Sequence, residues 1–352
     1  MTAKIGFACK FSVNTNKGIE AVPELNVGGT TIAWLNRQSK QVAEQKLWDL
    51  MKKNIEAVRC LVEKVSQQDE HLRMVRIGSD ILPAYTESSW SYFWRLPDVQ
   101  NYAAREFEKV GNIARASSTR LSMHPGQFTV LASDNPEIVN KSIEEFEYHA
   151  TMAAWMGYGK QFQDFKINVH ISGRQGPDGI RKVLDRLSPE ARNCITIENE
   201  EMSHGLDNCL MLADVVPIVL DVHHHHIHSG EYIKCTDPRI SKIIDSWRGV
   251  RPVIHYSASR EDLLVNHPTT RRPHLPSLLD EGYSKQKLRA HSDFMWNTAL
   301  NKWAYTHWSW ADVMVEAKGK NLASFKLFEF WKSLENTVSP VLESKTNTSS
   351  DS

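Results

Sequence analysis

Short apolar segments alternate with longer amphipathic segments along most of the chain. The apolar segments predict eight strands, at residues 4–9, 73–77, 121–124, 166–170, 194–198, 217–221, 252–257 and 312–317. Helical spacing of hydrophobic residues predicts helices at 41–67, 97–115, 136–155, 178–187, 206–215, 238–247, 285–300 and 322–334. The predicted strands are apolar along nearly their whole length, which is typical of parallel strands buried on both faces. Eight strand–helix repeats predict an α/β fold, a single (β/α)8 TIM barrel over residues 1–338.

Three segments do not fit the repeat and carry separate predictions. The tail at 339–352, SPVLESKTNTSSDS, is polar and serine-rich, so we predict that it is disordered. Long connections follow the second strand, with the sequence TESSWSYFWRLPD, and the seventh strand, over residues 258–285. In a TIM barrel both connections lie on the face where active sites are built.

Side chains of the types that ligate metals stand at or near the carboxyl ends of six predicted strands. They are His124, His170, Glu198, Asp221, His224, His255 and Glu316. Taken singly, each could be a hydrogen-bonded core histidine or a capping carboxylate. Together they would converge on one rim of the barrel, where burial of several carboxylates and imidazoles is costly unless divalent cations neutralise them.

This ligand set predicts more than one ion. A mixture of imidazoles and carboxylates suits Zn²⁺ or Mn²⁺, and seven ligands exceed one coordination sphere, so we predict two or three ions. Paired metal ions are a usual device for breaking phosphodiesters. The run DVHHHHIH at 221–228 could be a loop that binds metals without a role, but its place directly after a strand favours a site.

Composition narrows the class of protein without fixing its partner. The chain has 352 residues, with 42 basic and 42 acidic side chains, so binding of nucleic acid through the whole surface is disfavoured while a locally basic groove is not. Five cysteines without C-x-x-C spacing indicate a reducing compartment. Because no apolar run approaches the ~20 residues of a membrane span, we predict a cytoplasmic protein with no membrane partner.

The motifs of the chain resemble those of a known family. LSMHPGQFTVL, INVHISG, TIENEE, VLDVHHH, WRGVRPVIHYSAS, AHSDF and ADVMVEAKGK follow one another in the order of the UV damage endonuclease family, from about residue 4 to residue 320. The resemblance implies a TIM barrel related to the abasic-site endonucleases, with two to three divalent ions, typically Mn²⁺, although Zn²⁺ or Mg²⁺ would also suit it. It further implies nicking of double-stranded DNA on the 5′ side of a pyrimidine photoproduct, by a bacterial-type protein that associates with the nucleoid when it acts.

Residue roles also follow from the resemblance. The seven strand-end residues become metal ligands, and the motif AHSDF adds His291 as an eighth. Glu198, Glu316 and Lys318 become catalytic candidates, although Lys318 could equally be a solvated loop lysine. Gln127 and Phe128, which follow HPG, correspond to a pair that probes the lesion by entering the duplex; otherwise they are a loop glutamine and a packed ring.

Three further residues are candidates for contact with DNA. Phe7 stands where a tyrosine is common in the family and would keep a ring for stacking. Arg271 and Arg272, in the long loop after the seventh strand, are candidates for phosphate contacts, with a solvated loop as the alternative.

Two departures from the family pattern concern the third metal. Glu87 stands where relatives can carry a ligand histidine, and its carboxylate could ligate instead. Val253 stands where relatives can carry a lysine that becomes carboxylated and bridges metals. Because valine cannot coordinate, we predict that the third ion is absent, weakly held, or held through a water.

Two other functions suit the same barrel: an abasic-site endonuclease and a metal-dependent sugar isomerase. The segment HPGQF and the aromatic loop residues favour a DNA substrate over a sugar. Nothing in the sequence calls for an obligate protein partner.

Overall fold

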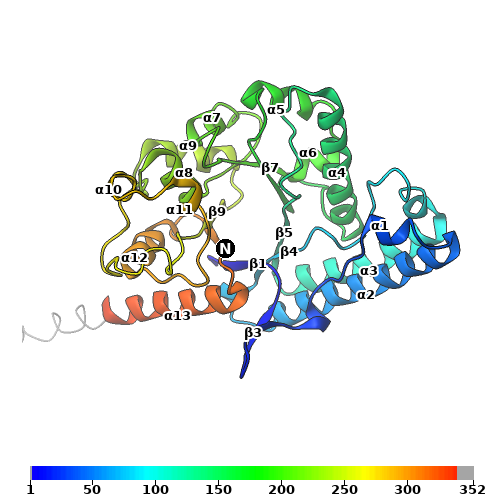
Figure 1. The fold of residues 1–352 in the computed structure, drawn as a ribbon, viewed down its shortest axis with the longest axis horizontal. Helices are drawn as coiled ribbons and strands as arrows, with labels where there is room; N and C mark the ends of the chain where they lie inside the picture. Colours follow the sequence, from blue (N-terminus) through cyan, green and yellow to red (C-terminus); the bar gives the residue numbers. More distant parts are fainter. Residues whose placement is uncertain (1, 339–352) are drawn as a thin grey trace, which may run out of the picture.

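The computed structural model describes residues 2–338, and eight parallel strands form its centre (Figure 1). The strands are β1 (Ile5–Cys9), β4 (Met74–Ile77), β5 (Arg120–Met123), β6 (Lys166–His170), β7 (Ile195–Glu198), β8 (Ile218–Val219), β9 (Val253–Tyr256) and β10 (Asp312–Val315). Their order in the sheet is β8-β7-β6-β5-β4-β1-β10-β9. A bridge between Asp221 and His255 joins the two outermost strands, with the His255 N–H donating to the Leu220 carbonyl over 3.0 Å. The predicted eight-stranded parallel barrel is confirmed.

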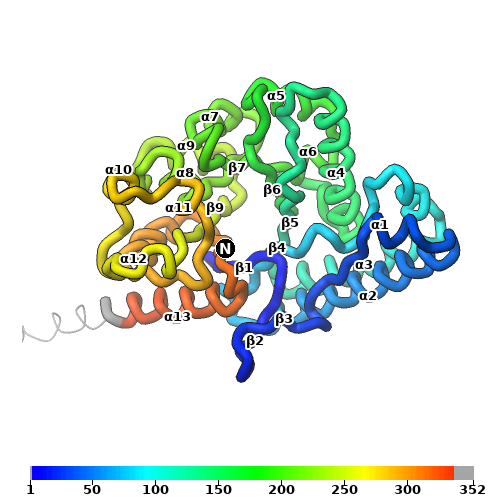
Figure 2. The backbone as a smooth tube through the Cα atoms, in the orientation of Figure 1, coloured from blue at the N-terminus to red at the C-terminus, as the bar shows by residue number. Residues whose placement is uncertain are grey.

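Helices surround this ring of strands (Figures 1 and 2). They are α1 (Ile32–Leu35), α2 (Lys40–Ser66), α3 (Pro97–Ala116), α4 (Pro136–Trp155), α5 (Gly176–Leu184), α6 (Pro189–Cys194), α7 (Leu206–Leu210), α8 (Val222–Ser229), α9 (Pro238–Ser246), α10 (Leu275–Asp280), α11 (Lys285–Leu288), α12 (Thr298–His307) and α13 (Lys320–Val338). Within residues 2–338, no helix combines the length and the apolar character that a membrane crossing requires. The tail predicted at 339–352 lies outside the described residues.

Two predicted helices are wrong in extent. The helix expected at 206–215 ends at Leu210. The helix expected at 285–300 is replaced by the short helices α11 and α12, which an extended segment separates. His291 in that segment pairs with Ser259, and the side chain of Asn297 accepts from the Leu300 N–H to start a new helix. The bridge to Ser259 and the cap at Asn297 therefore interrupt the helix that the spacing of hydrophobic residues predicted over 285–300.

A hairpin that the sequence reading missed follows β1. Its strands are β2 (Ser12–Thr15) and β3 (Gly18–Ala21), and Figure 2 shows it projecting from the barrel. Its base is fixed by Asn321 of α13, whose side chain accepts from the Ser12 N–H over 2.7 Å and donates to the Ser12 carbonyl over 3.0 Å. These strands are short and mostly polar, so they lack the apolar alternation that identifies a half-buried strand.

The alternation of β1 decides which of its side chains enter the barrel. Gly6 faces the interior, because a Cβ there would lie 2.7 Å from the Met74 Cγ and 3.1 Å from the Met314 Cε. Phe7 therefore points outward, where its ring meets Phe11 and Phe325 at centroid distances of 5.8 and 6.3 Å. Only 1% of Phe7 is exposed. The expectation that Phe7 stacks on DNA is corrected, because this ring belongs to the core.

We expect Phe7→Ala to lower the free energy of unfolding by about 3 to 5 kcal/mol, because it leaves a cavity among three packed rings. Phe128, which is 85% exposed, provides the matched control, and Phe128→Ala should change stability by no more than about 0.5 kcal/mol. Urea unfolding of the metal-free proteins measures both. Similar losses in the two variants would contradict this assignment of Phe7 to the core.

Candidate metal centre

The structure brings together all seven of the predicted strand-end ligands in three overlapping groups. These are His124–His170–Glu198, Glu198–Asp221–His224 and Asp221–His255–Glu316, and within each group the candidate ligand atoms lie within 4.8 Å of one another. Glu198 belongs to the first two groups, and Asp221 to the last two. Two shared carboxylates thus connect the three groups into one polar cluster at the carboxyl ends of the strands.

Glu198, the last residue of β7, lies at the centre of this cluster and is fully buried. Its Oε1 lies 3.0 Å from the His255 Nδ1 and 3.4 Å from the His224 Nδ1. Its Oε2 lies 3.3 Å from the His124 Nε2 and 3.5 Å from the His170 Nε2. Burial acts to raise the pKa of Glu198, but the His255 and His170 imidazoles outweigh burial and hold this pKa well below its usual range. Glu198 is therefore a buried carboxylate anion with two imidazoles near each of its oxygens.

The pKa of Asp221 is shifted in the opposite direction to that of Glu198. It caps α8, and its Oδ1 accepts from the His224 N–H over 2.7 Å, but its Oδ2 is buried without a hydrogen-bond partner. Burial raises the pKa of Asp221 well above its usual value. An orphaned carboxylate oxygen amid imidazoles and a second carboxylate is suited to a divalent cation, so the residues present fit a metal centre.

Two basic side chains, from the two strands that flank β5, also reach this cluster, and neither was predicted from the sequence. Arg76 of β4 pairs with the Glu316 carboxylate. Lys166 of β6 places its Nζ 2.9 Å from the His255 Nε2. The signal for Arg76 was a charged residue inside the apolar strand MVRI, and the signal for Lys166 was a charged residue at the start of KINVH. A lysine thus does reach the ligands, from β6 rather than from the position of Val253 on β9.

His291 and Lys318 lie at the edge of the cluster. The His291 Nδ1 lies 4.0 Å from the Glu316 Oε2, and the residue is in none of the three groups. Lys318 has a side chain that is 54% exposed, with its Nζ 3.5 Å from the Asp293 Oδ1. Both therefore lie outside the three ligand groups.

The histidine run 223–226 forms half of helix α8, and its members have different environments. Within the run 223–226, only His224 is among the three ligand groups. His225 places its Nε2 3.1 Å from Glu231, and His226 stacks on Tyr232 with ring centroids 4.0 Å apart. His223 is buried, and its ring centroid lies 5.8 Å from that of His291. The run is therefore a helix with one inward-facing ligand candidate rather than a metal-binding loop.

Glu87 is not brought to the ligand groups. It lines a hollow of about 1270 Å³ together with Gly78, Gly126 and Phe128, and its Oε1 accepts from the Ser88 hydroxyl. The expectation that its carboxylate replaces a ligand histidine is corrected, because the loop after β4 places Glu87 in this hollow and none of the three groups includes it.

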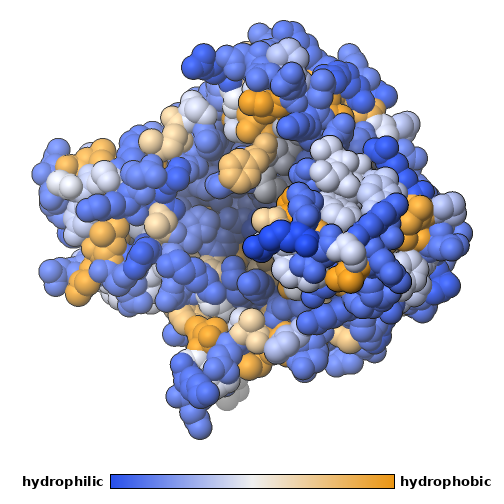
Figure 3. All heavy atoms as spheres, turned by 45° about the vertical axis from the view of Figure 1, so that its right-hand side comes forward, coloured by the Kyte–Doolittle hydropathy of each residue, from blue (hydrophilic) through white to orange (hydrophobic). Residues whose placement is uncertain are grey.

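Apart from Phe7, the proposed DNA-contacting residues named above lie on exposed loops. Gln127 and Phe128 are exposed in the segment that directly follows His124. Arg271 and Arg272 are exposed in the loop after β9, and the Arg272 guanidinium lies 5.1 Å from the centroid of the Tyr232 ring. Figure 3 shows a hollow with mainly hydrophilic walls on one face of the molecule.

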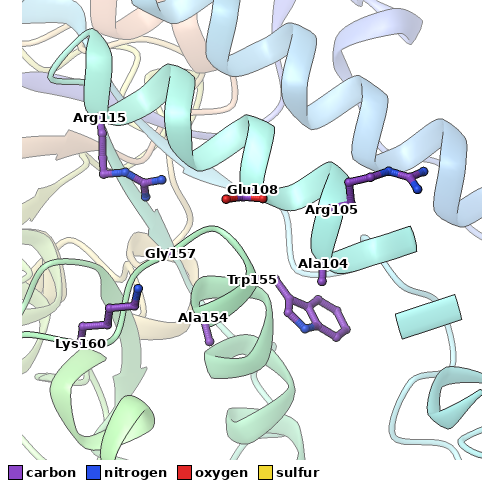
Figure 4. Close-up of a pocket in the computed structure, with 8 residues that line it drawn as sticks. All are labelled: Ala104, Arg105, Glu108, Arg115, Ala154, Trp155, Gly157 and Lys160. Carbon is purple, nitrogen blue, oxygen red and sulfur yellow. The ribbon is translucent and has the colours of Figure 1, made fainter. Parts of the chain in front are cut away.

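A second pocket lies on the outer wall of the barrel, away from the candidate ligands. Figure 4 shows its lining by α3, α4 and the turn after α4, around a volume of about 630 Å³. Of its cations, Arg105 is paired with Glu106, and Arg115 donates to the Met156 carbonyl over 2.5 Å. None of the predicted site residues lines this pocket.

A family model and two relatives that are similar to this chain are all described as UV endonucleases. A model of the family described as UV-endonuclease UvdE matches residues 3–346. The UV-damage endonuclease of Schizosaccharomyces pombe is 26% identical over 352 residues, which cover 96% of this chain and 52% of that protein. The UV DNA damage endonuclease of Bacillus cereus strain B4264 is 23% identical over 312 residues, which cover 85% and 87%. The chain thus spans about half the length of the S. pombe relative and most of the B. cereus relative.

Among solved structures, SacUVDE superimposes with a TM-score of 0.71 at 20% sequence identity, over 95% of this chain and 99% of that one. This likeness supports the barrel fold.

Lys166 yields a prediction about pH. Burial lowers the pKa of Lys166 to about 7, from an ordinary value of 10.5. Between these values the unfolded chain binds a proton that the folded chain does not, so this lysine makes stability rise with pH. We expect Lys166→Met to reduce that rise, as measured by urea unfolding of metal-free protein at about pH 7.5 and about pH 9.5. The exposed Lys182→Met is the control, and an equal slope in both variants would contradict the burial of Lys166.

Proposed function

The chain belongs to the UV-endonuclease UvdE family, and on that premise we propose that it is a metal-dependent DNA-repair endonuclease acting on UV-damaged DNA. It nicks the strand on the 5′ side of a pyrimidine dimer or related photoproduct, which begins excision repair. The observation that carries this proposal is the position of Glu198, a fully buried carboxylate shared by two groups of candidate ligands. A carboxylate with one oxygen for each of two ions is suited to a paired-metal phosphodiesterase.

The candidate ligands fall on the two sides of Glu198, which could hold one ion with each of its oxygens. His124 and His170 lie on the side of its Oε2, and His224 and His255 lie on the side of its Oε1. Asp221 supplies the orphaned Oδ2. Mn²⁺ suits this mixture of imidazole and carboxylate ligands. When bound, such ions polarise the phosphoryl oxygen, provide hydroxide and stabilise the leaving oxygen.

A third ion is held weakly or not at all. Val253 offers no donor atom, and the Arg76 guanidinium already pairs with the Glu316 carboxylate. Like charges disfavour one another at such short range, so Arg76 reduces the affinity for a further cation near Glu316. His291, which lies 4.0 Å from Glu316, is the remaining donor for that position.

The DNA is recognised by residues outside the metal cluster. A photoproduct stacks and pairs poorly, so its extrusion costs less than that of normal bases, and the exposed ring of Phe128 with the amide of Gln127 fills the gap. Arg271 and Arg272 hold phosphates of the backbone, and Lys318 meets the scissile phosphate. An exposed aromatic ring beside the ligands favours a DNA substrate over a sugar, which a closed polar pocket would hold.

We expect Glu198→Gln to abolish nicking of UV-irradiated supercoiled plasmid and to lower the number of bound ions, because an amide cannot bridge two cations. Wild-type protein purified under gentle conditions should hold about two divalent ions by elemental analysis. Glu200→Gln is the matched control. Glu200 lies two residues after Glu198, accepts a hydrogen bond from the Ser203 N–H and is in none of the ligand groups.

The same assay separates the alternatives. Depurinated plasmid as the preferred substrate would favour the abasic-site endonuclease, and full activity in chelator or in Glu198→Gln would overturn the metal mechanism. Sugar isomerisation without any nicking would favour the third candidate function.

We expect Gln127→Ala and Phe128→Ala to reduce the preference for damaged over undamaged DNA, since a stacked ring contributes about 1 to 3 kcal/mol per base. Fluorescence anisotropy with matched damaged and intact duplexes measures this preference. Because Phe128 is exposed, the variants should stay folded. Equal loss of affinity for both duplexes would assign the pair a general role in DNA binding.

A further inference from the structure

Glu201 is a buried carboxylate that touches the ligand cluster without belonging to any of its groups. Its Oε2 lies 3.7 Å from the His224 Nε2, and its Oε1 accepts from the Arg289 Nη1 over 2.7 Å. These contacts connect three segments that each carry candidate ligands. Glu201 lies three residues after Glu198, and Arg289 lies two residues before His291.

The two nitrogens of His224 face different surroundings. Nδ1 lies toward the carboxylates, 3.4 Å from Glu198 and 3.8 Å from Asp221, so it is the atom that would bind an ion in this group. Nδ1 also lies 3.0 Å from the Asn199 carbonyl, to which it would donate if it carried the proton. Ligation requires the other tautomer, with the proton on Nε2 and the Nδ1 lone pair free.

A negative charge facing Nε2 favours the tautomer that ligation needs. The Glu201 carboxylate is in that position, and Arg289 holds its other oxygen so that Oε2 remains directed at the ring. A carboxylate or carbonyl behind a ligating histidine commonly fixes the tautomer and orientation of the ring in this way.

We propose that Glu201, held by Arg289, is a positioning residue for His224, which selects the tautomer that binds metal and thereby sets the affinity of the Glu198–Asp221–His224 group. Glu201 does not touch the ion or the DNA. This inference rests on the proposed metal centre, which it deepens by assigning a role to two residues outside the ligand groups.

The experiment measures Mn²⁺ binding directly, by calorimetric titration of metal-stripped protein in the absence of DNA. We expect Glu201→Gln, which keeps the shape of the side chain, to weaken one Mn²⁺ site by about tenfold or more. Arg289→Gln should weaken the same site less. The double variant should bind no more weakly than Glu201→Gln, because the two residues act through one contact.

The matched control is Glu200→Gln, one residue away, which should bind Mn²⁺ as the wild type does. A structural role is tested separately by the thermal midpoint of metal-free protein, which Glu201→Gln should lower by no more than Arg289→Gln does, because both variants break the same ion pair. The tautomer is read from long-range ¹⁵N–¹H spectra of Zn²⁺-loaded protein, a diamagnetic form in which the His224 proton should lie on Nε2 in the wild type. The signal of that proton should shift in Glu201→Gln, and the His224→Gln spectrum provides the assignment.

The outcomes distinguish this inference from the proposed function. If wild-type protein binds no Mn²⁺, the proposed metal centre fails. If the wild type binds Mn²⁺ and Glu201→Gln binds it equally well, or if Glu201→Gln lowers the thermal midpoint more than Arg289→Gln does, the role of Glu201 is overturned and the metal centre stands.

Discussion

Glu198 and Asp221 are buried at the carboxyl ends of the barrel strands, and the surrounding structure has to compensate for the loss of their contact with water. Both residues are fully buried, and each is shared between two groups of candidate ligands. A carboxylate removed from water needs donors or cations on both oxygens. The imidazoles around Glu198 supply this need, whereas the Oδ2 of Asp221 has no donor. The fold therefore stabilises the charge of Glu198 by itself, whereas Asp221 keeps an oxygen that is available to a cation.

The basic side chains inside the barrel change how many ions its carboxylates need. The Arg76 guanidinium offsets the charge of Glu316, whereas Lys166, whose pKa is lowered by burial to about 7, lies against His255. In a low-dielectric interior, a fixed cation such as Arg76 competes with mobile cations for the same carboxylate. The barrel thus requires fewer ions for neutrality than its number of carboxylates alone indicates.

The sequence predicted the barrel and the convergence of the seven strand-end candidates, because a polar residue that ends an apolar run is visible in the pattern itself. Phe7 was misassigned since Ile5–Cys9 is apolar throughout, and only the close packing of Gly6 against Met74 shows which residues face inward. Glu87 was misplaced because the path of a long loop depends on its tertiary contacts. Glu200 and Glu201 are adjacent and chemically alike, and the fold of the loop alone decides which one reaches His224.

The joint between β8 and β9 has a consequence for how the barrel holds together. β8 comprises two residues, and one bridge, between Asp221 and His255, connects it to β9. Both residues of this bridge belong to the same group of candidate ligands. An ion held by Asp221 and His255 would link β8 to β9, the two adjacent strands that a single bridge joins. Binding of such an ion would then also make the contact between β8 and β9 harder to open locally. The stability of this part of the fold and the chemistry of the site would depend on the same ion.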